Sequence, residues 1–218
     1  MMEIFYLLLK LMAILLTNSI FVHIPKTAGK WVSEAIINNV KGANFIGDPI
    51  YDAHKVSLDY NLPQFAFSRN PETWLHSLWK HRARKKLNNY GKRFNWQNKH
   101  KLERECKSYF FHIFFLKAAL KKEIIKNYYD DFINQQNQIS FGKQENLANE
   151  LIRLLEKYNE NFNKEGILVS KKKIINPTNR RTKKINIYKT NYIFRYFLER
   201  NNIEFYKSMK YPTLTIKN

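Results

Sequence analysis

The chain has 218 residues, a single cysteine, and 38 Lys and Arg against 18 Asp and Glu, which gives a formal net charge of +20. This length predicts one domain with a core of its own. Because Cys106 stands alone, an intrachain disulfide and a zinc site built from several cysteines are excluded. The positive field favours polyanionic partners, which include nucleotide phosphates, acidic glycans, nucleic acid and anionic lipid.

The chain begins with a strongly apolar segment, IFYLLLKLMAILL at residues 4–16. It is shorter than the roughly 20 residues that a membrane span needs, and it contains Lys10. No small-residue cleavage site of a secretory signal follows it. We interpret residues 1–17 as an apolar helix that packs on the domain or contacts a membrane surface, which leaves both a cytoplasmic and a membrane-associated location open.

Residues 19–37, SIFVHIPKTAGKWVSEAII, change their hydrophobic period halfway. Residues 20–24 are apolar, with the β-branched and aromatic side chains typical of a buried parallel strand. The strand stops at Pro25, which cannot donate to a sheet ladder. Beyond Gly29 the apolar residues lie on one side of a predicted helix, at Val32, Ala35, Ile36 and Val40.

The loop between this strand and this helix is a natural anion site. Free N–H groups and the positive end of the helix dipole meet there, and Lys26, Thr27 and Lys30 add side-chain donors. The P-loop pattern GxxxxGK[ST] does not fit, because Ile24 and Trp31 occupy the first-glycine and Ser/Thr positions. Without a hydroxyl for Mg²⁺, ATP hydrolysis is disfavoured. An ordinary strand–helix turn is the other interpretation.

His54 is a candidate general base. It follows a loop-like stretch, residues 41–52, and precedes the next predicted strand. A lone histidine is more often a surface or capping residue. A loop at this place, however, brings the imidazole over the sheet edge that also holds Lys26, and its ordinary pKa near 6.5 suits the removal of an alcohol proton at neutral pH.

A second strand–helix unit follows at residues 64–78, QFAFSRNPETWLHSL. Residues 65–68 form a predicted buried strand, and Asn70 with Pro71 is a strong helix start. Ser77 lies about two turns further on, on the face toward the strand end. Arg69 stands at the carboxyl edge of the strand, where open α/β sheets bind ligands, so a shared phosphate contact with Ser77 is favoured over a simple pairing with a carboxylate.

HIPKTAGK and FSRNPETWLHSLW together resemble the two nucleotide-binding signatures of sulfotransferases that use 3′-phosphoadenosine 5′-phosphosulfate (PAPS). The likeness is greatest to the carbohydrate type related to heparan and uronyl 2-O-sulfotransferases and their bacterial relatives. It implies that Arg69 and Ser77 hold the 3′-phosphate and that His54 serves as base. The residues implied for the 5′-phosphosulfate are Lys26, Thr27, Gly29 and Lys30, and Pro25, Ala28 and Trp31 of the same segment are also predicted to bind the nucleotide. Two positions depart from the family pattern: Lys30 replaces a Thr or Ser, and Trp74 replaces a second Arg.

Two basic stretches allow more than one interpretation. Residues 80–107 are rich in Lys and Arg with interleaved aromatics, which is typical of a solvated helix and loop or of a surface that binds a sugar acceptor. Nucleic-acid binding is disfavoured because no recognised module frames this stretch. Residues 174–184 form a predicted solvated loop; alternatively, as the resemblance implies, Arg180 and Arg181 fold over the 3′-phosphate.

The remaining elements are predicted from their periodicity. Residues 109–119 form a buried helix with His112 in the core, and Asp130 and Asp131 begin a polar helix. Residues 139–142 form a third strand. Asn146 then caps a helix whose buried stripe consists of Leu147, Leu151, Leu154 and Leu155. Residues 191–200 are the last predicted helix.

The sequence therefore predicts an α/β, P-loop-like three-layer fold, with a short and mostly parallel sheet flanked by helices, in a single sulfotransferase-like domain over residues 1–218. By resemblance, it moves a sulfuryl group from PAPS to a hydroxyl of an acceptor, a carbohydrate, without a metal. Lys26 stabilises the leaving oxygen and His54 deprotonates the acceptor. Two alternatives stay open: a kinase-like phosphoryl transferase and a non-catalytic polyanion-binding protein.

Overall fold

A computed structural model describes residues 13–46, 61–87, 101–106, 110–133, 137–170 and 192–214, with side chains for all of these except 83–87. The chain divides into two compact units. The first contains residues 1–69 and 129–181, and the second contains residues 70–128 and 182–218. Each unit combines two separate stretches of chain, and the assignment of a single domain stays a prediction.

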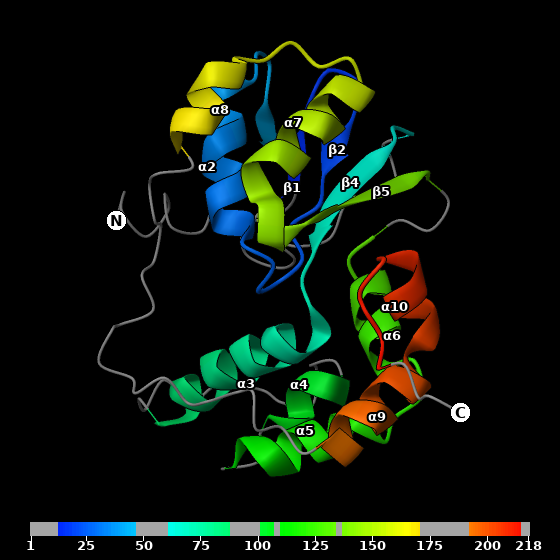
Figure 1. The fold of residues 1–218 in the computed structure, drawn as a ribbon. Coiled ribbons are helices and arrows are strands. Elements are labelled where there is room, and N and C mark those ends of the chain that lie inside the picture. Colours follow the sequence, from blue (N-terminus) through cyan, green and yellow to red (C-terminus); the bar gives the residue numbers. More distant parts are fainter. Residues whose placement is uncertain are drawn as a thin grey trace. The chain divides into compact units, whose positions relative to one another are not determined.

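The first unit is built on a five-stranded mixed sheet flanked by helices (Figure 1). The strand order is β3-β1-β2-β4-β5. Their bounds are β1 Ala13–Leu15, β2 Ile20–Phe21, β3 Asn44–Ile46, β4 Gln64–Ser68 and β5 Ile139–Lys143. The strands β2, β4 and β5 run parallel, whereas β1 is antiparallel to both β2 and β3. The prediction of an α/β sheet with three parallel strands is thus confirmed, although the first strand is shorter than the predicted 20–24 and the sheet is mixed rather than mostly parallel.

The antiparallel half of the sheet comes from the apolar N-terminal segment. Residues 13–15, predicted as part of a helix over residues 1–17, form β1 instead. A tight turn, in which the N–H of Leu16 donates to the Ser19 carbonyl at 2.9 Å, connects β1 to β2, and a connection this short allows only antiparallel pairing. Because β1 lies between two other strands, Ala13 and Ile14 are buried. Residues 1–12 lie outside the described part of the chain.

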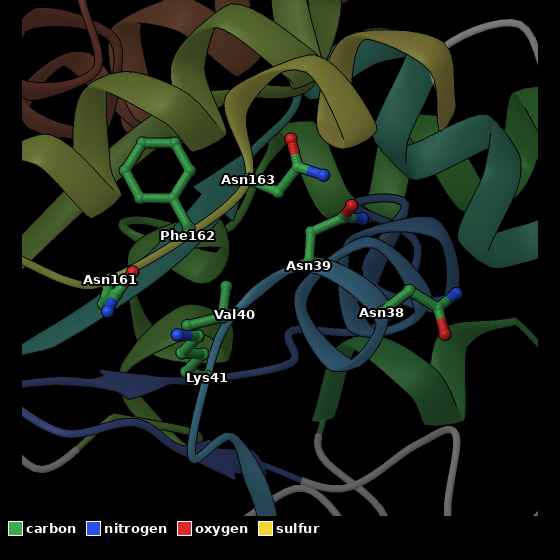
Figure 2. Close-up of a pocket in the computed structure, with 7 residues that line it drawn as sticks. All are labelled: Asn38, Asn39, Val40, Lys41, Asn161, Phe162 and Asn163. Atoms are coloured by element: carbon green, nitrogen blue, oxygen red, sulfur yellow. The ribbon is translucent and has the colours of Figure 1, made fainter.

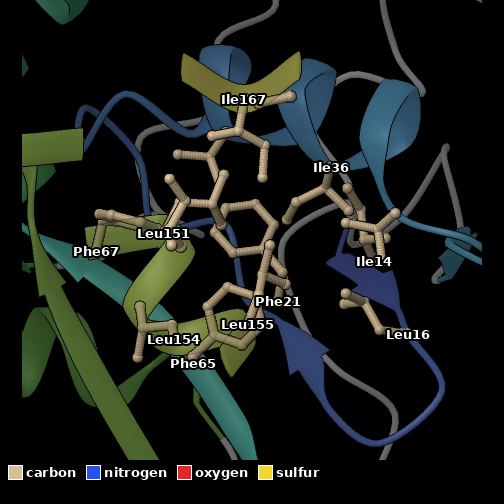
Figure 3. Packing of buried hydrophobic residues seen from close by; sticks show 14 of the residues in the cluster. Ile14, Leu16, Phe21, Ile36, Phe65, Phe67, Leu151, Leu154, Leu155 and Ile167 are labelled. Carbon is tan, nitrogen blue, oxygen red and sulfur yellow. The ribbon is translucent and has the colours of Figure 1, made fainter. Parts of the chain in front are cut away.

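Two helices cover one face of this sheet. They are α2, Gly29–Asn39, and α7, Leu147–Lys157, which follows the short 3₁₀ helix η3, Gln144–Asn146; α8, Lys164–Ser170, packs beside both. Figure 3 shows the resulting core, in which Phe21, Phe65 and Phe67 of the strands meet the helices. The predicted helical stripes are confirmed as buried, except that Leu147 is only partly buried.

The described part of the second unit is helical. Its helices are α3 Pro71–Leu87, α4 Lys101–Glu105, α5 Phe111–Ala119, α9 Tyr192–Asn201 and α10 Ile203–Ser208, while α6, Ile124–Asp130, crosses from this unit into the first. Trp74 is fully buried and packs edge-on against Tyr128, with ring centroids 5.0 Å apart. The residue at the position of the family's second Arg is therefore part of the core of this unit.

Two predictions for the helices are wrong. His112 is exposed on α5 rather than in the core, and Ile113 beside it is also exposed. An apolar helix of nine residues still has an outer face when neighbours cover only one side. Asp130 ends α6 instead of beginning a helix with Asp131, since the helix already starts at Ile124.

The start of α3 provides a matched pair for a capping experiment. The Asn70 side-chain oxygen accepts hydrogen bonds from the N–H groups of Glu72 and Thr73, at 3.2 and 3.4 Å. Asn146 occupies the same position before α7 but makes no side-chain capping bond. We expect Asn70→Ala to lower the free energy of unfolding by about 1 kcal/mol, and Asn146→Ala to change it by less than about 0.5 kcal/mol. Urea titration measures both; equal losses would contradict the capping geometry.

Cys106 is expected to be chemically inert in the folded protein. Its side chain is 1 % exposed, and burial raises the pKa of the thiol far above its ordinary value, with a further contribution from the nearby Glu103 carboxylate. Because the thiolate is the reactive form, Ellman's reagent at pH 8 should detect no thiol in the native protein and one thiol per chain in denaturant. Full reaction of the native protein would show that this part of the second unit opens readily.

Candidate functional site

The connection between β2 and α2 has an unusual backbone. Lys26 and Ala28 both adopt positive φ angles, 72° and 68°, which non-glycine residues rarely do. The Thr27 hydroxyl donates to the Ile24 carbonyl at 2.8 Å and closes the turn from inside. A backbone that alternates in this way directs successive N–H groups into one concavity, the arrangement that binds anions. Two strained residues within three positions also indicate a functional constraint on the loop.

The first turn of α2 opens into this concavity. Ala28 stands at the N-cap without a side-chain capping bond, and its carbonyl accepts from the N–H groups of Trp31 and Val32, at 2.9 and 3.2 Å. The N–H groups of Gly29 and Lys30 therefore have no acceptor within the helix. No acidic residue lies in the first turn, so the positive end of the helix dipole is not neutralised from within α2.

The loop packs closely against the end of its own strand through Gly29. A Cβ atom at this position would lie 1.8 Å from Cδ2 and 2.1 Å from Nε2 of His23. His23 is 4 % exposed, and its ring lies nearly parallel to that of Phe21, 6.4 Å away. Sequence reasoning missed His23. The sequence feature that could have identified it is a histidine within the predicted apolar strand, two residues before the PKTAG motif.

The second motif meets the first at the carboxyl end of the sheet. Arg69 directly follows β4, the parallel neighbour of β2, and its Nη1 donates to the Lys26 carbonyl at 3.5 Å. This contact joins the HIPKTAGK loop to Arg69, the last residue of the first unit before Asn70. The next parallel strand adds a third cation, because Lys143 at the end of β5 pairs in register with Ser68. Lys143 was also missed, although a lysine directly after a predicted strand was visible in the sequence.

The other predicted site residues are distributed as follows. Pro25, Lys26 and Lys30 are partly exposed, whereas Thr27 is buried. Trp31 is mostly buried, and its indole N–H donates to the Ser170 carbonyl at 3.0 Å. Ser77 lies in α3, which belongs to the second unit. Three residues lie outside the described part of the chain: His54, Arg180 and Arg181.

The loop can thus hold an anion between backbone N–H groups and cations. Lys26 and Lys30 follow β2, Arg69 follows β4 and Lys143 ends β5, so four cationic residues stand at the carboxyl ends of three neighbouring parallel strands. Cations and backbone N–H groups can donate charge-assisted hydrogen bonds to a phosphate or sulfate. They can also stabilise negative charge that develops on an oxygen.

Within the ranges that the structure describes, no group of three or more His, Cys, Asp or Glu side chains is arranged to hold a metal ion. None of the helices described is long and apolar enough to span a bilayer. No protein-family model matches the chain, and neither a curated protein nor a solved structure matches it significantly.

Proposed function

We propose that this protein is a PAPS-dependent sulfotransferase that moves a sulfuryl group to a hydroxyl of an acceptor. The observation that carries the proposal is the hydrogen bond from Arg69 to the carbonyl of Lys26. It joins Lys26 of the first motif to Arg69, the residue of the second motif that lies in the same unit, at a loop whose positive φ angles and uncapped helix suit an anion.

The loop residues have a defined task in this reaction. Transfer breaks the bond between sulfur and the bridging oxygen of the phosphosulfate and forms a bond from sulfur to the acceptor oxygen. The hydroxyl proton passes to a base, and the products are the sulfate ester and 3′-phosphoadenosine 5′-phosphate. Lys26 and the N–H groups of Gly29 and Lys30 stabilise the charge that grows on the leaving oxygen. His54 is proposed as the base.

The surroundings of position 31 favour sulfuryl over phosphoryl transfer. A P-loop kinase needs a Ser or Thr hydroxyl there to bind Mg²⁺. The chain has Trp31, whose indole packs inward and donates to the Ser170 carbonyl. A sulfuryl donor carries less charge at the reacting centre than a triphosphate, so the cations of the loop suffice for it. The carbohydrate nature of the acceptor is proposed from the family resemblance alone.

Calorimetry with 3′-phosphoadenosine 5′-phosphate tests the proposal. We expect saturable heat with this nucleotide and much weaker binding of its 3′-dephospho analogue, adenosine 5′-phosphate. ADP with Mg²⁺ is the matched comparison for a kinase. Tight binding of ADP–Mg²⁺ alone would favour phosphoryl transfer. Heparin binding without any nucleotide heat would favour a non-catalytic polyanion-binding protein and overturn the proposal.

A further inference from the structure

A polar cavity lies in the first unit, at the C-terminal end of α2 and away from the loop between β2 and α2 (Figure 2). It has a volume of about 340 Å³ and is lined by Asn38, Asn39, Val40, Lys41, Asn161, Phe162 and Asn163. Since α2 has 11 residues, the two sites are separated by about 16 Å along the helix axis. The cavity is therefore distinct from the loop that holds Lys26.

The cavity is preorganised by a short antiparallel bridge. Val40 pairs with Phe162, and two backbone hydrogen bonds flank the pair: Lys41 N–H to the Asn161 carbonyl at 3.0 Å, and Asn163 N–H to the Asn39 carbonyl at 2.8 Å. Side chains alternate between the two faces of such a bridge. Val40 and Phe162 accordingly pack on the core, whereas Lys41, Asn161 and Asn163 are exposed and Asn39 is partly buried.

Two of the polar side chains are fixed by structural hydrogen bonds. The Asn39 amide nitrogen donates to the Ala35 carbonyl at 2.9 Å, and the Asn163 amide oxygen accepts from the Gly166 N–H at 3.0 Å. The amide NH₂ of Asn163 stays available, since each amide has both a donor and an acceptor end. These two side chains are thus held in place, and the Asn163 amide NH₂ can still donate a hydrogen bond into the cavity.

Three further side chains are available to a ligand. Among the described residues, no hydrogen bond or ion pair involves the side chains of Asn38, Lys41 or Asn161, and all three are exposed. The two amides offer donors and acceptors together, and the lysine offers donors only.

The charges at this cavity select a neutral ligand. The negative end of the α2 dipole disfavours phosphate and other anions, and the Lys41 ammonium disfavours cations. Alternating donors and acceptors complement adjacent hydroxyl groups, and the volume stands at the lower end of the range of about 300–1,000 Å³ for small-molecule pockets. We propose that this cavity binds a single neutral saccharide ring. The inference does not depend on sulfuryl transfer.

Titration of the ¹⁵N-labelled full chain with the methyl glycosides of glucose, galactose and N-acetylglucosamine tests the inference. With at least one glycoside, chemical-shift changes should be confined to the amides of residues 38–41 and 161–163. Asn161→Ala removes a donor and an acceptor and should weaken binding about tenfold. Asn149→Ala serves as the control, because Asn149 is an exposed asparagine of α7 outside the cavity and should leave the affinity unchanged.

Three results would overturn the inference. They are the absence of shifts at these amides with every glycoside at high millimolar concentration, an unchanged affinity in Asn161→Ala, and larger shifts at these amides with inorganic phosphate than with any glycoside. The last result would mean that Lys41 outweighs the helix dipole and that the cavity is an anion site. None of these outcomes concerns nucleotide binding at the Lys26 loop, so the two proposals are tested separately.

Discussion

Replacing Lys26 by glutamine is expected to lower the kcat of the proposed sulfuryl transfer by at least about a hundredfold, because the proposal assigns to this charge the stabilisation of the leaving oxygen. Glutamine keeps most of the side-chain length and removes only the charge. It is no better suited than lysine to the positive φ of 72° at this position, so the backbone strain is matched between the two proteins. Transfer of labelled sulfate from PAPS to a polysaccharide panel measures the effect.

The pattern of loss identifies what Lys26 does. A charge that acts mainly in the transition state lowers kcat more than it weakens binding of 3′-phosphoadenosine 5′-phosphate, whereas a charge that only binds the nucleotide raises Kd and leaves kcat unchanged. Lys26→Arg keeps a cation and should retain part of the activity. Full turnover of Lys26→Gln would remove Lys26 from the mechanism.

Lys164→Gln provides the matched control for the removal of a positive charge. Lys164 is 60 % exposed in α8 of the same unit, and its ion pair with Glu156, at 3.0 Å, lies on the surface. Such pairs contribute little to stability, so this variant should fold and react like the parent. A similar loss in both variants would mean that overall charge, rather than the position of Lys26, determines activity.

Local chemistry explains which parts of the fold the sequence could predict. Asn70 followed by Pro71 defines a helix start within two residues, and the side-chain oxygen of Asn70 caps it. Residues 65–67 are apolar, and β4, which contains them, is a fully buried strand between two parallel neighbours. These signals lie within a few residues of the structure they determine, so no knowledge of the rest of the chain is needed.

Other features depend on partners far away in the sequence. The apolar run that ends at Leu16 is compatible with a helix or a buried strand, and the pairing with residues 44–46 decides in favour of a strand. Lys143 stands at the same edge of the sheet as Arg69 only because β5 lies beside β4, a neighbour more than 70 residues earlier. A strand order of this kind is not encoded in any short segment, which explains why Lys143 was missed.

The sequence did not predict the division into two units either. The chain leaves the sheet at Arg69, and Asn70 already belongs to the second unit. No linker composition marks this point, because a compact turn with a capped helix makes the transition. The second unit also includes residues from 182 onward. This long-range association arises from the packing of helices, such as that of α9 on α5.

Gly29→Ala is expected to abolish nucleotide binding and to lower the free energy of unfolding by about 1–3 kcal/mol, the usual cost of overpacking a filled site. The new methyl group would lie 1.8 Å from the His23 ring, so the ring or the loop must move. The His23 ring is buried and lies beside the Phe21 ring, so it has little space to move away from the new methyl group. Displacement of the loop then turns the N–H groups of Gly29 and Lys30 away from the proposed anion site. Urea unfolding and calorimetry with 3′-phosphoadenosine 5′-phosphate measure the two effects.

A double-mutant cycle isolates this contact. His23→Ala leaves room for the added methyl group, so the free-energy cost of His23→Ala with Gly29→Ala should be smaller than the sum of the single costs by about 0.5–3 kcal/mol. Gly42→Ala is the comparison, because Gly42 has a φ of 75° and its Cβ would meet only the Thr17 hydroxyl, at 3.7 Å. Its cost of about 1 kcal/mol comes from backbone strain and should be the same with and without His23. Strict additivity of Gly29→Ala and His23→Ala would mean that close packing on His23 does not determine the shape of the loop between β2 and α2.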